Sequence, residues 1–289
     1  MKRLFLSLLV LCSSVMAEPI NIVVPVSPGG NIDMFARTLS KYLMENNVNN
    51  IVTYHTGASG DIAYAHVMNK HDNVIMVAAT GNFVLSHVFQ NRDNFYATTM
   101  TFVAPMAEAP PSFVTGTKGY ANFKAMIKDA KNNVVMCGVS SANALELYKI
   151  NQEYGTHFEA VPYKGTAQLK MDLLGNQIQC GYDGTGAYIP DHQTEKLKIL
   201  ASVKSITPGV TTMNTVLPGY YFTSWFGVGI PNGSNLLENP SFVNLLIKFR
   251  SQKDVADQLL SSGILLSNPD PGINAKMVQQ TAQYKTFLK

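Results

Sequence analysis

Five short loops rich in glycine, hydroxyl and amide residues each follow an apolar segment of the chain. They are SPGG, TGASG, ATGN, VSSAN and YKGT, beginning at residues 27, 56, 79, 139 and 163. Glycine lets a ligand approach the main chain closely, and a helix N-terminus offers unpaired N–H groups and a partial positive charge. This chemistry suits a small anion that is held without a dense cluster of charged side chains.

The alternative interpretation is five ordinary turns between strands and helices, which favour the same residue types. We favour binding because ligands of open α/β sheets lie at the carboxyl ends of the strands, where these loops are expected. In the first loop we expect Asn31 to cap a helix. A side chain at Gly30 would occupy the ligand's space or require a positive φ. The candidate ligand-binding residues are Ser27, Pro28, Gly29, Gly30, Asn31, Ser59, Thr80, Asn82, Ser140, Ser141, Asn143, Tyr163, Gly165, Thr166 and Asp183.

The sequence lacks the motifs of common catalytic sites. GASGD does not have the spacing of a nucleophile elbow, and no glycine-rich loop ends in Gly-Lys-Ser or Gly-Lys-Thr as a P-loop does. His66 and His71 lie five residues apart, which misses the four-residue spacing that puts two metal ligands on one helix face. We therefore expect no enzyme activity, no cofactor and no metal site.

Apolar segments alternate with helix-like segments in two separate runs, and this alternation would position the loops. Strands that alternate with helices form parallel sheets with right-handed crossovers, so the pattern predicts two α/β domains. The predicted strands of the first run lie at residues 20–26, 50–55 and 73–80, and those of the second at 132–141, 158–165, 178–184 and 196–203.

Two segments that contain proline and glycine, at residues 102–119 and 219–234, are expected to cross between the domains. The tail from residue 240 onward has a helical pattern, with Asn239 before Pro240 as a start signal, and is expected to pack on the first domain. We assign residues 18–117 and 222–289 to the first domain and residues 118–221 to the second.

The first 17 residues have the features of a secretory signal peptide. Lys2 and Arg3 precede an apolar segment too short to span a bilayer comfortably, and Val15-Met16-Ala17 fits the small-residue cleavage rule. The alternative is a membrane anchor that stays attached. Cleavage after Ala17 removes two of the 22 basic residues and leaves all 19 acidic ones, a net charge of +1. This charge gives no indication of nucleic-acid binding, and we expect an exported, soluble monomer.

Cys137 and Cys180 are the cysteines that remain after this cleavage. In a βαβαβ unit the third strand often returns beside the first, so we expect the two residues on neighbouring strands of the second domain. Two cysteines in an exported chain can form a disulfide. The alternative, which we favour, is two buried thiols that act as small hydrophobic groups.

Four segments of the chain carry a family resemblance. They are INIVVPVSPGGNIDMFAR at residues 20–37, GASGDIAYAHV at 57–67, VPYKGTAQLKMDLLGNQIQCGYDG at 161–184 and WFGVGIPNG at 225–233. These segments, in this order, resemble the solute-binding proteins of tripartite tricarboxylate transporters, also called the Bug family. The chain departs from the family pattern at Ser27, where alanine is usual, and at Ser59, where glycine is usual.

The resemblance implies a two-domain periplasmic solute-binding fold of type II-like architecture, with the ligand enclosed in the interdomain cleft. It implies that the ligand is a small organic acid, which is delivered to the membrane permease subunits of a tripartite transporter. It also suggests that the loops Ser27–Asn31 and Ser140–Asn143 bracket a ligand carboxylate, often through ordered waters.

We interpret the protein as an extracytoplasmic binding protein for a small carboxylate. The first alternative is an α/β hydrolase or transferase, which would need a nucleophile with a nearby base. The second is a sensing subunit that presents its ligand-bound state to a membrane kinase. In the YKGT loop we expect the main chain of Gly165 and Thr166, rather than the side chain of Lys164, to meet the ligand.

Overall fold

The first apolar segment forms strand β1, Ile20–Val24, and all five of its residues are buried. Ile22 and Val24 pack in the apolar cluster beneath helix α1 (Asn31–Glu45), whereas Val23 packs in a cluster on the opposite face. Successive side chains of a strand point to opposite faces, so a strand covered on both faces needs a continuous apolar run. The computed structural model describes residues 18–140, 143–163, 166–222, 224–268 and 270–286.

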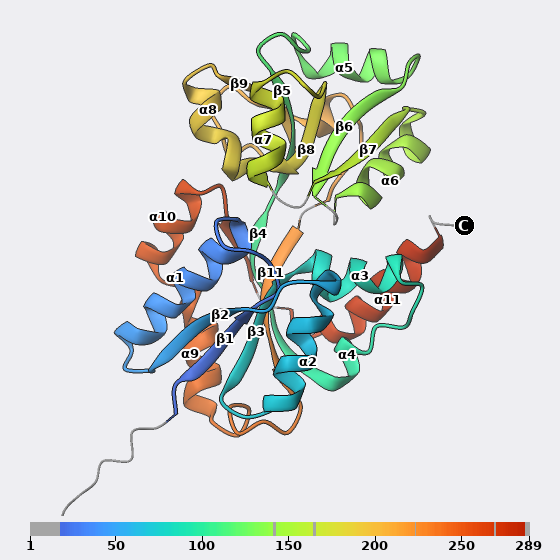
Figure 1. Ribbon diagram of the computed structural model, residues 1–289. Helices are drawn as coiled ribbons and strands as arrows, with labels where there is room; N and C mark the ends of the chain where they lie inside the picture. Colours follow the sequence, from blue (N-terminus) through green and yellow to red (C-terminus); the bar gives the residue numbers. More distant parts are fainter. Residues whose placement is uncertain (1–17, 141–142, 164–165, 223, 269, 287–289) are drawn as a thin grey trace, which may run out of the picture.

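Two six-stranded mixed sheets organise the chain into two lobes (Figure 1). This architecture confirms the predicted α/β class with two sheets. In spatial order, the first sheet contains β12 (Leu265–Leu266), β4 (Met100–Ala109), β11 (Ser224–Pro231), β3 (Val74–Ala79), β1 and β2 (Asn50–Tyr54). The second contains β10 (Thr211–Thr212), β9 (Leu197–Ser202), β5 (Pro111–Gly116), β8 (Cys180–Gly184), β6 (Val135–Ser140) and β7 (Phe158–Tyr163).

Helices cover both faces of the first sheet. One face packs against α1, α9 (Pro240–Phe249) and α10 (Lys253–Ser261). The other packs against α2 (Asp61–Lys70), α3 (Ser86–Phe89), α4 (Tyr96–Thr99) and α11 (Ile273–Lys285). Asn239 caps α9 by accepting a hydrogen bond from the Phe242 N–H, and Pro240 occupies the first turn. The predicted start signal and the return of the helical tail to the first sheet are both confirmed.

The second sheet is covered in the same manner. One face packs against α5 (Phe123–Ala130) and α6 (Ala144–Tyr154), and the other against α7 (Thr166–Leu174) and the start of α8 (Ile189–Gln193). Short helical turns complete the chain at Ala58–Gly60 (η1), Gly81–Leu85 (η2), Thr185–Tyr188 (η3) and Met213–Thr215 (η4).

The chain passes between the lobes along extended segments (Figure 1). β4 leads through Pro110 directly into β5 of the second sheet, and β11 returns antiparallel to β4, with Ser224 opposite Ala109. Both predicted crossing segments therefore contain strands. β5 pairs with β8 and β9 of the second sheet, although our residue boundaries placed it in the first domain; those boundaries stay a proposal.

Residues 1–17, where we predict the signal peptide and its cleavage after Ala17, lie outside the described residues. Among the helices that the structure describes, none combines the length and the apolar character needed to cross a membrane.

Cys137 and Cys180 face each other across the parallel strands β6 and β8 and form a disulfide. Their Cα atoms are 4.6 Å apart, within the range that disulfides require. The neighbouring-strand prediction is confirmed, and the preference for two free thiols is wrong. Parallel strands seldom suit a disulfide, but here the two residues are direct partners in register, so both side chains point to the same face of the sheet.

Reduction of this disulfide should lower the free energy of unfolding by about 2–4 kcal/mol, because the bond closes a loop between residues 43 apart in sequence. The expected loss of melting temperature is roughly 2–4 °C per kcal/mol, measured calorimetrically with and without reductant. The Cys137→Ala/Cys180→Ala double variant is the control and should not respond to reductant. Equal melting temperatures for the native chain in both buffers would contradict the disulfide.

Glu146 of α6 is a fully buried acid next to three tyrosines. Tyr220 donates a hydrogen bond to Glu146 Oε2 at 3.3 Å, and the hydroxyls of Tyr220 and Tyr182 lie 2.7 Å apart. Tyr284 of α11, in the first lobe, also bonds this carboxyl group. Burial raises the pKa of Glu146 from 4.5 to about 7, against the opposing effects of Lys149 and of the tyrosine hydroxyls.

Because the folded protein holds a proton on Glu146 that the unfolded chain releases, stability should fall as pH rises from about 4.5 to about 7. Glu146→Gln keeps the shape of the side chain and removes the titration. The variant should therefore lose this part of the pH dependence, as measured by chemical unfolding at half-unit pH steps. An unchanged slope between pH 4.5 and 7 would show that Glu146 does not titrate in this range.

Candidate functional site

A cleft of about 500 Å³ lies between the lobes, at the carboxyl ends of strands from both sheets. First-lobe residues come from the loop after β1, from η1, and from the η2–α3 region after β3. Second-lobe residues come from the starts of α6 and α7 and from the end of β8. The lining residues are Val26, Ser27, Pro28, Gly29, Gly30, Asn31, Ile32, Ser59, Ala79, Gly81, Asn82, Ser86, Phe89, Ala109, Pro111, Asn143, Tyr163, Thr166, Ala167, Gln168, Asp183, Gly184, Ser224 and Phe226.

The loop after β1 is fixed by the carboxylate of Asp33. Asp33 Oδ2 accepts the Gly29 N–H at 2.8 Å, while Oδ1 accepts Arg37 Nε at 2.9 Å and the Tyr54 hydroxyl at 2.5 Å. Burial alone would raise the pKa of Asp33, but the hydrogen bonds from Tyr54 and Gly29 and the charge of Arg37 hold this pKa below its ordinary value. Asp33 lies in the first turn of α1 and holds the glycine turn against that helix, as the acid of a capping box does.

Two details of the first loop differ from expectation. The N-cap of α1 is Gly30, and Asn31 is the first helical residue, so Asn31 does not cap the helix. The positive φ belongs to Gly29, at +98°, whereas Gly30 has an extended backbone with φ −97° that any residue can adopt. A Cβ atom at Gly30 would have no atom within 4 Å. Gly30 therefore leaves open space in the cleft.

The first turn of α1 offers main-chain donors to this space. The first hydrogen bond that reaches back to the N-cap runs from Met34 N to Gly30 O at 3.0 Å. The N–H groups of Asn31 and Ile32 precede this bond and have no acceptor within the helix. Asn31 also faces the second lobe, because a Cβ atom at Gly184 would lie 2.6 Å from Asn31 Nδ2. The lobes are in close contact at this point.

Asp183 is the acidic centre of the second-lobe side of the cleft. Its Oδ2 accepts the Thr166 hydroxyl at 2.7 Å and the Tyr188 hydroxyl at 3.3 Å, and its Oδ1 accepts Asn143 Nδ2 at 3.3 Å. Asp183 and Asn143 are each only 6% exposed. These bonds connect the starts of α6 and α7 to the end of β8.

Of the other predicted residues, Ser59, Asn82 and Tyr163 line the cleft and Thr80 does not. The Thr80 hydroxyl accepts the Trp225 N–H at 3.0 Å and lies 3.4 Å from the Trp225 carbonyl oxygen. Thr80 therefore connects the end of β3 to β11 and does not contact the cleft. Asn82 Nδ2 donates to the Ser59 carbonyl at 3.2 Å, and the Tyr163 hydroxyl donates to Asp172 Oδ2 at 2.7 Å.

Ser141 and Gly165 lie outside the described residues, and Ser140 is described only as the last residue of β6.

Several lining residues were not predicted. Phe226 lies in a crossing strand, where no sequence pattern shows which side chains face the cleft. Ser86 and Phe89 follow the ATGN loop by about one and two helical turns, and Gln168 follows Thr166 in the first turn of α7. An extension of each predicted loop into the first turn of its helix would have found Gln168 and Ile32, since helix N-termini form the ends of such clefts.

Among the described residues that line the cleft, Ser86 is the only serine that we find in contact with a histidine, the fully buried His87. Ser86 Oγ donates to the Asn82 carbonyl at 2.6 Å and lies 3.1 Å from His87 Nδ1. Within the described residues His87 Nε2 has no hydrogen-bond partner, so no third group orients the ring. Burial lowers the pKa of His87 to about 4. This pair therefore lacks the arrangement of an activated nucleophile.

A metal site is likewise not formed by the described part of the chain, where no three His, Cys, Asp or Glu side chains gather.

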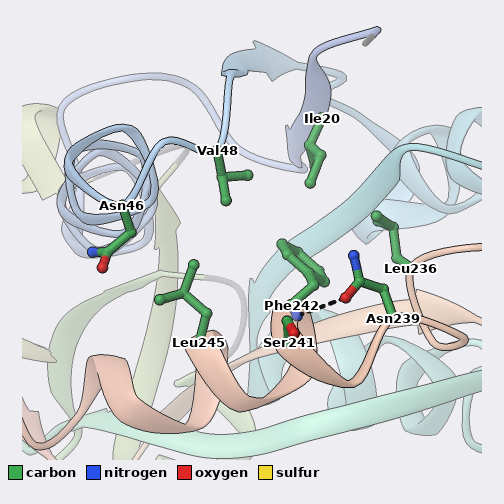
Figure 2. A pocket seen from close by; sticks show the side chains of 8 residues that line it. All are labelled: Ile20, Asn46, Val48, Leu236, Asn239, Ser241, Phe242 and Leu245. Atoms are coloured by element: carbon green, nitrogen blue, oxygen red, sulfur yellow. Dashed lines mark hydrogen bonds between the residues drawn. The ribbon is translucent and has the colours of Figure 1, made fainter.

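A second hollow, of about 330 Å³, lies in the first lobe alone (Figure 2). It is formed around Ile20 at the start of β1, the end of α1 and the first turns of α9. Asn239 and Phe242, which are joined by the α9 cap, contribute to its wall (Figure 2). Because this hollow lies at the opposite end of β1 from the glycine loop, it is separate from the cleft, and we assign it no function.

The two lobes, their crossing strands and the cleft at the strand ends define the fold of a periplasmic solute-binding protein. The structure of the periplasmic binding protein BugD has a TM-score of 0.75 to this chain at 22% identity, covering 93% of this chain and 96% of BugD. The structure of Rpa4515 from R. palustris, determined with adipate, has a TM-score of 0.81 at 23% identity, covering 94% and 97%.

A family model described as the tripartite tricarboxylate transporter family receptor matches residues 35–256. Protein BugT of Bordetella pertussis is 22% identical over 292 residues, covering 92% of this chain and 88% of BugT. The chain belongs to the tripartite tricarboxylate transporter receptor family, and the resemblance found in the sequence is confirmed.

Gly30→Val should fold normally, because the backbone at Gly30 is extended and its Cβ position is open, and should abolish the binding of a ligand in the cleft, because the valine side chain would fill part of it. Circular dichroism of the Gly30→Val variant measures its folding, and calorimetric titration of the same variant measures its ligand binding. Gly29→Val is the matched control and should lower the melting temperature, because valine is strained at φ +98°. A folded Gly30→Val protein with undiminished binding would exclude this loop from the binding site.

Proposed function

We propose that the protein captures a small organic acid in the interlobe cleft and delivers it to a tripartite tricarboxylate-type membrane permease. The observation that carries the proposal is the first turn of α1, where main-chain N–H groups without helical acceptors line the cleft beside an open glycine. A carboxylate bound there gains the hydrogen bonds and the partial positive charge of the helix end.

Ligand capture couples to the relative position of the two lobes. The cleft is lined from both lobes, so a ligand that contacts both stabilises their approach, in the way that hinged binding proteins close. Several contacts join the lobes. For example, Asn31 lies close to Gly184, and Glu108 of β4 forms an ion pair with Lys204 of the second lobe. The function is binding without chemistry, which fits the incomplete Ser86–His87 pair.

The proposal includes an extracytoplasmic location. Export would follow from the predicted signal peptide, cleaved after Ala17, and the product would act in the periplasm as a monomer with the permease as its partner. The disulfide between Cys137 and Cys180 supports this location, because disulfides persist in oxidising compartments.

A thermal-shift screen of carboxylates tests the proposal. An acid present at a hundred times its dissociation constant should add about 2.7 kcal/mol to the free energy of unfolding, which raises the melting temperature by several degrees. Adipate, the ligand in the Rpa4515 structure, belongs in the screen together with acids of other lengths. Uncharged amides of the same acids are controls and should give no shift. A screen in which no carboxylate raises the melting temperature would contradict the proposal.

A further inference from the structure

The two lobes are in contact on both sides of the molecule. On the side of α10, a Cβ atom added at Gly186 of η3 would collide with the main-chain carbonyl of Ser262, which follows α10, so the lobes meet main chain to main chain. On the opposite side, α6 of the second lobe lies next to α11 of the first (Figure 1). The structure therefore shows a closed form of the protein.

Leu145, at the start of α6, extends from the second lobe into the first. It is 1% exposed and packs in the apolar cluster of the first lobe that also contains Trp225 and, from α11, Ile273 and Met277. Separation of the lobes would withdraw Leu145 from this cluster and let water reach it. Trp225 is the single tryptophan of the chain, so its fluorescence can report this separation.

Glu146, the next residue along α6, is fully buried between the same two lobes. Tyr220 bonds the carboxyl group from the second lobe, and Tyr284 of α11 bonds it from the first. The titratable groups that act on its charge are Lys149 and Glu153 of α6, Tyr182 of β8, Tyr220 before β11 and Tyr284 of α11. Lys149 Nζ also lies 4.0 Å from Glu153 Oε1, so its charge is shared between two carboxyl groups.

Opening of the lobes would remove α11 from Glu146 and expose the carboxyl group to water. Burial favours the neutral form of a carboxyl group, and water favours its ionised form. In the closed form burial raises the pKa of Glu146 to about 7, and exposure would return this pKa toward 4.5. The closed form therefore binds the extra proton. Its advantage over the open form is complete below about pH 4.5 and falls by about two orders of magnitude as the pH rises to about 7.

From this arrangement we infer that Glu146 and Tyr284 form a pH-sensitive switch between the lobes, which stay together while Glu146 is protonated and separate when it ionises. Neither residue is among the described residues that line the cleft, so the switch acts on ligand binding through the movement of the lobes. A ligand captured at acidic pH would be released more readily at neutral pH. The inference depends on the lobe movement of the proposed function and not on the identity of the ligand.

The fluorescence emission of Trp225 in the ligand-free protein, recorded from pH 4.5 to pH 8, tests the inference. The emission maximum should move to longer wavelength as the pH rises to about 7, because Leu145 leaves the cluster, and small-angle X-ray scattering should give a larger radius of gyration at pH 8 than at pH 4.5. Far-UV circular dichroism should stay constant. A native chain whose emission does not change, or changes together with its circular dichroism, would overturn the inference; the carboxylate screen would still decide the proposed function.

Three variants assign the response to this contact. Glu146→Gln should keep the short-wavelength emission at every pH, because glutamine has a similar shape and does not ionise. Glu153→Gln is the matched control, since it removes an exposed acid of the same helix, and it should respond as the native chain does. Tyr284→Ala should complete a smaller response at lower pH, because water then reaches Glu146 in the closed form. A native response that persists in Glu146→Gln or is unchanged in Tyr284→Ala would overturn the inference.

Discussion

The pairing of β4 with β11 is the constraint on which the arrangement of the site depends. These antiparallel strands are neighbours inside the first sheet. β4 ends where the chain enters the second lobe, and β11 begins where the chain returns from it. Pro110 and Pro111 limit the backbone freedom of the passage into β5. The carboxyl ends of β1 and β3 therefore face those of β6 and β8 across one space, and the loops that lead into α1, α6 and α7 open into it.

Asp33 fixes the conformation of the turn at Gly29 and Gly30, which forms part of the cleft surface. A turn with two consecutive glycines has high conformational freedom in the unfolded chain, and its ordering is costly in entropy. The Gly29 N–H donates to Asp33, which is itself held by Tyr54 and Arg37, so the turn is connected to both α1 and β2. The adjacent Gly30, which has no side chain, leaves room for a ligand. The conformational entropy of the turn is lost during folding, so ligand binding does not have to order it.

The parts of this structure that depend on local pattern were predictable from the sequence. Continuous apolar runs predicted β1 and β3, because both faces of these strands are covered. Asn239-Pro240 marked the start of α9, and the loops after the strands marked most of the cleft.

Predictions failed where the answer depends on a partner distant in sequence. Thr80 has the type and position of a ligand donor, but its hydroxyl is used by Trp225, 145 residues away, on a strand whose antiparallel partner no local pattern identifies. The disulfide depends on the register between β6 and β8, which places Cys137 opposite Cys180. Asp33 was overlooked because an acid in the first turn of a helix is common, and its bond to Gly29 becomes evident only in three dimensions.

Amide chemical shifts measured during titration with the tightest-binding acid test the central claim most directly. The account predicts the largest perturbations at the N–H groups of Gly30, Asn31 and Ile32, with smaller ones at the start of α7, because these groups line the cleft at helix N-termini. Perturbations confined to Asn239–Leu245, at the separate hollow of the first lobe (Figure 2), would contradict it, since they would place the ligand at the wrong end of β1.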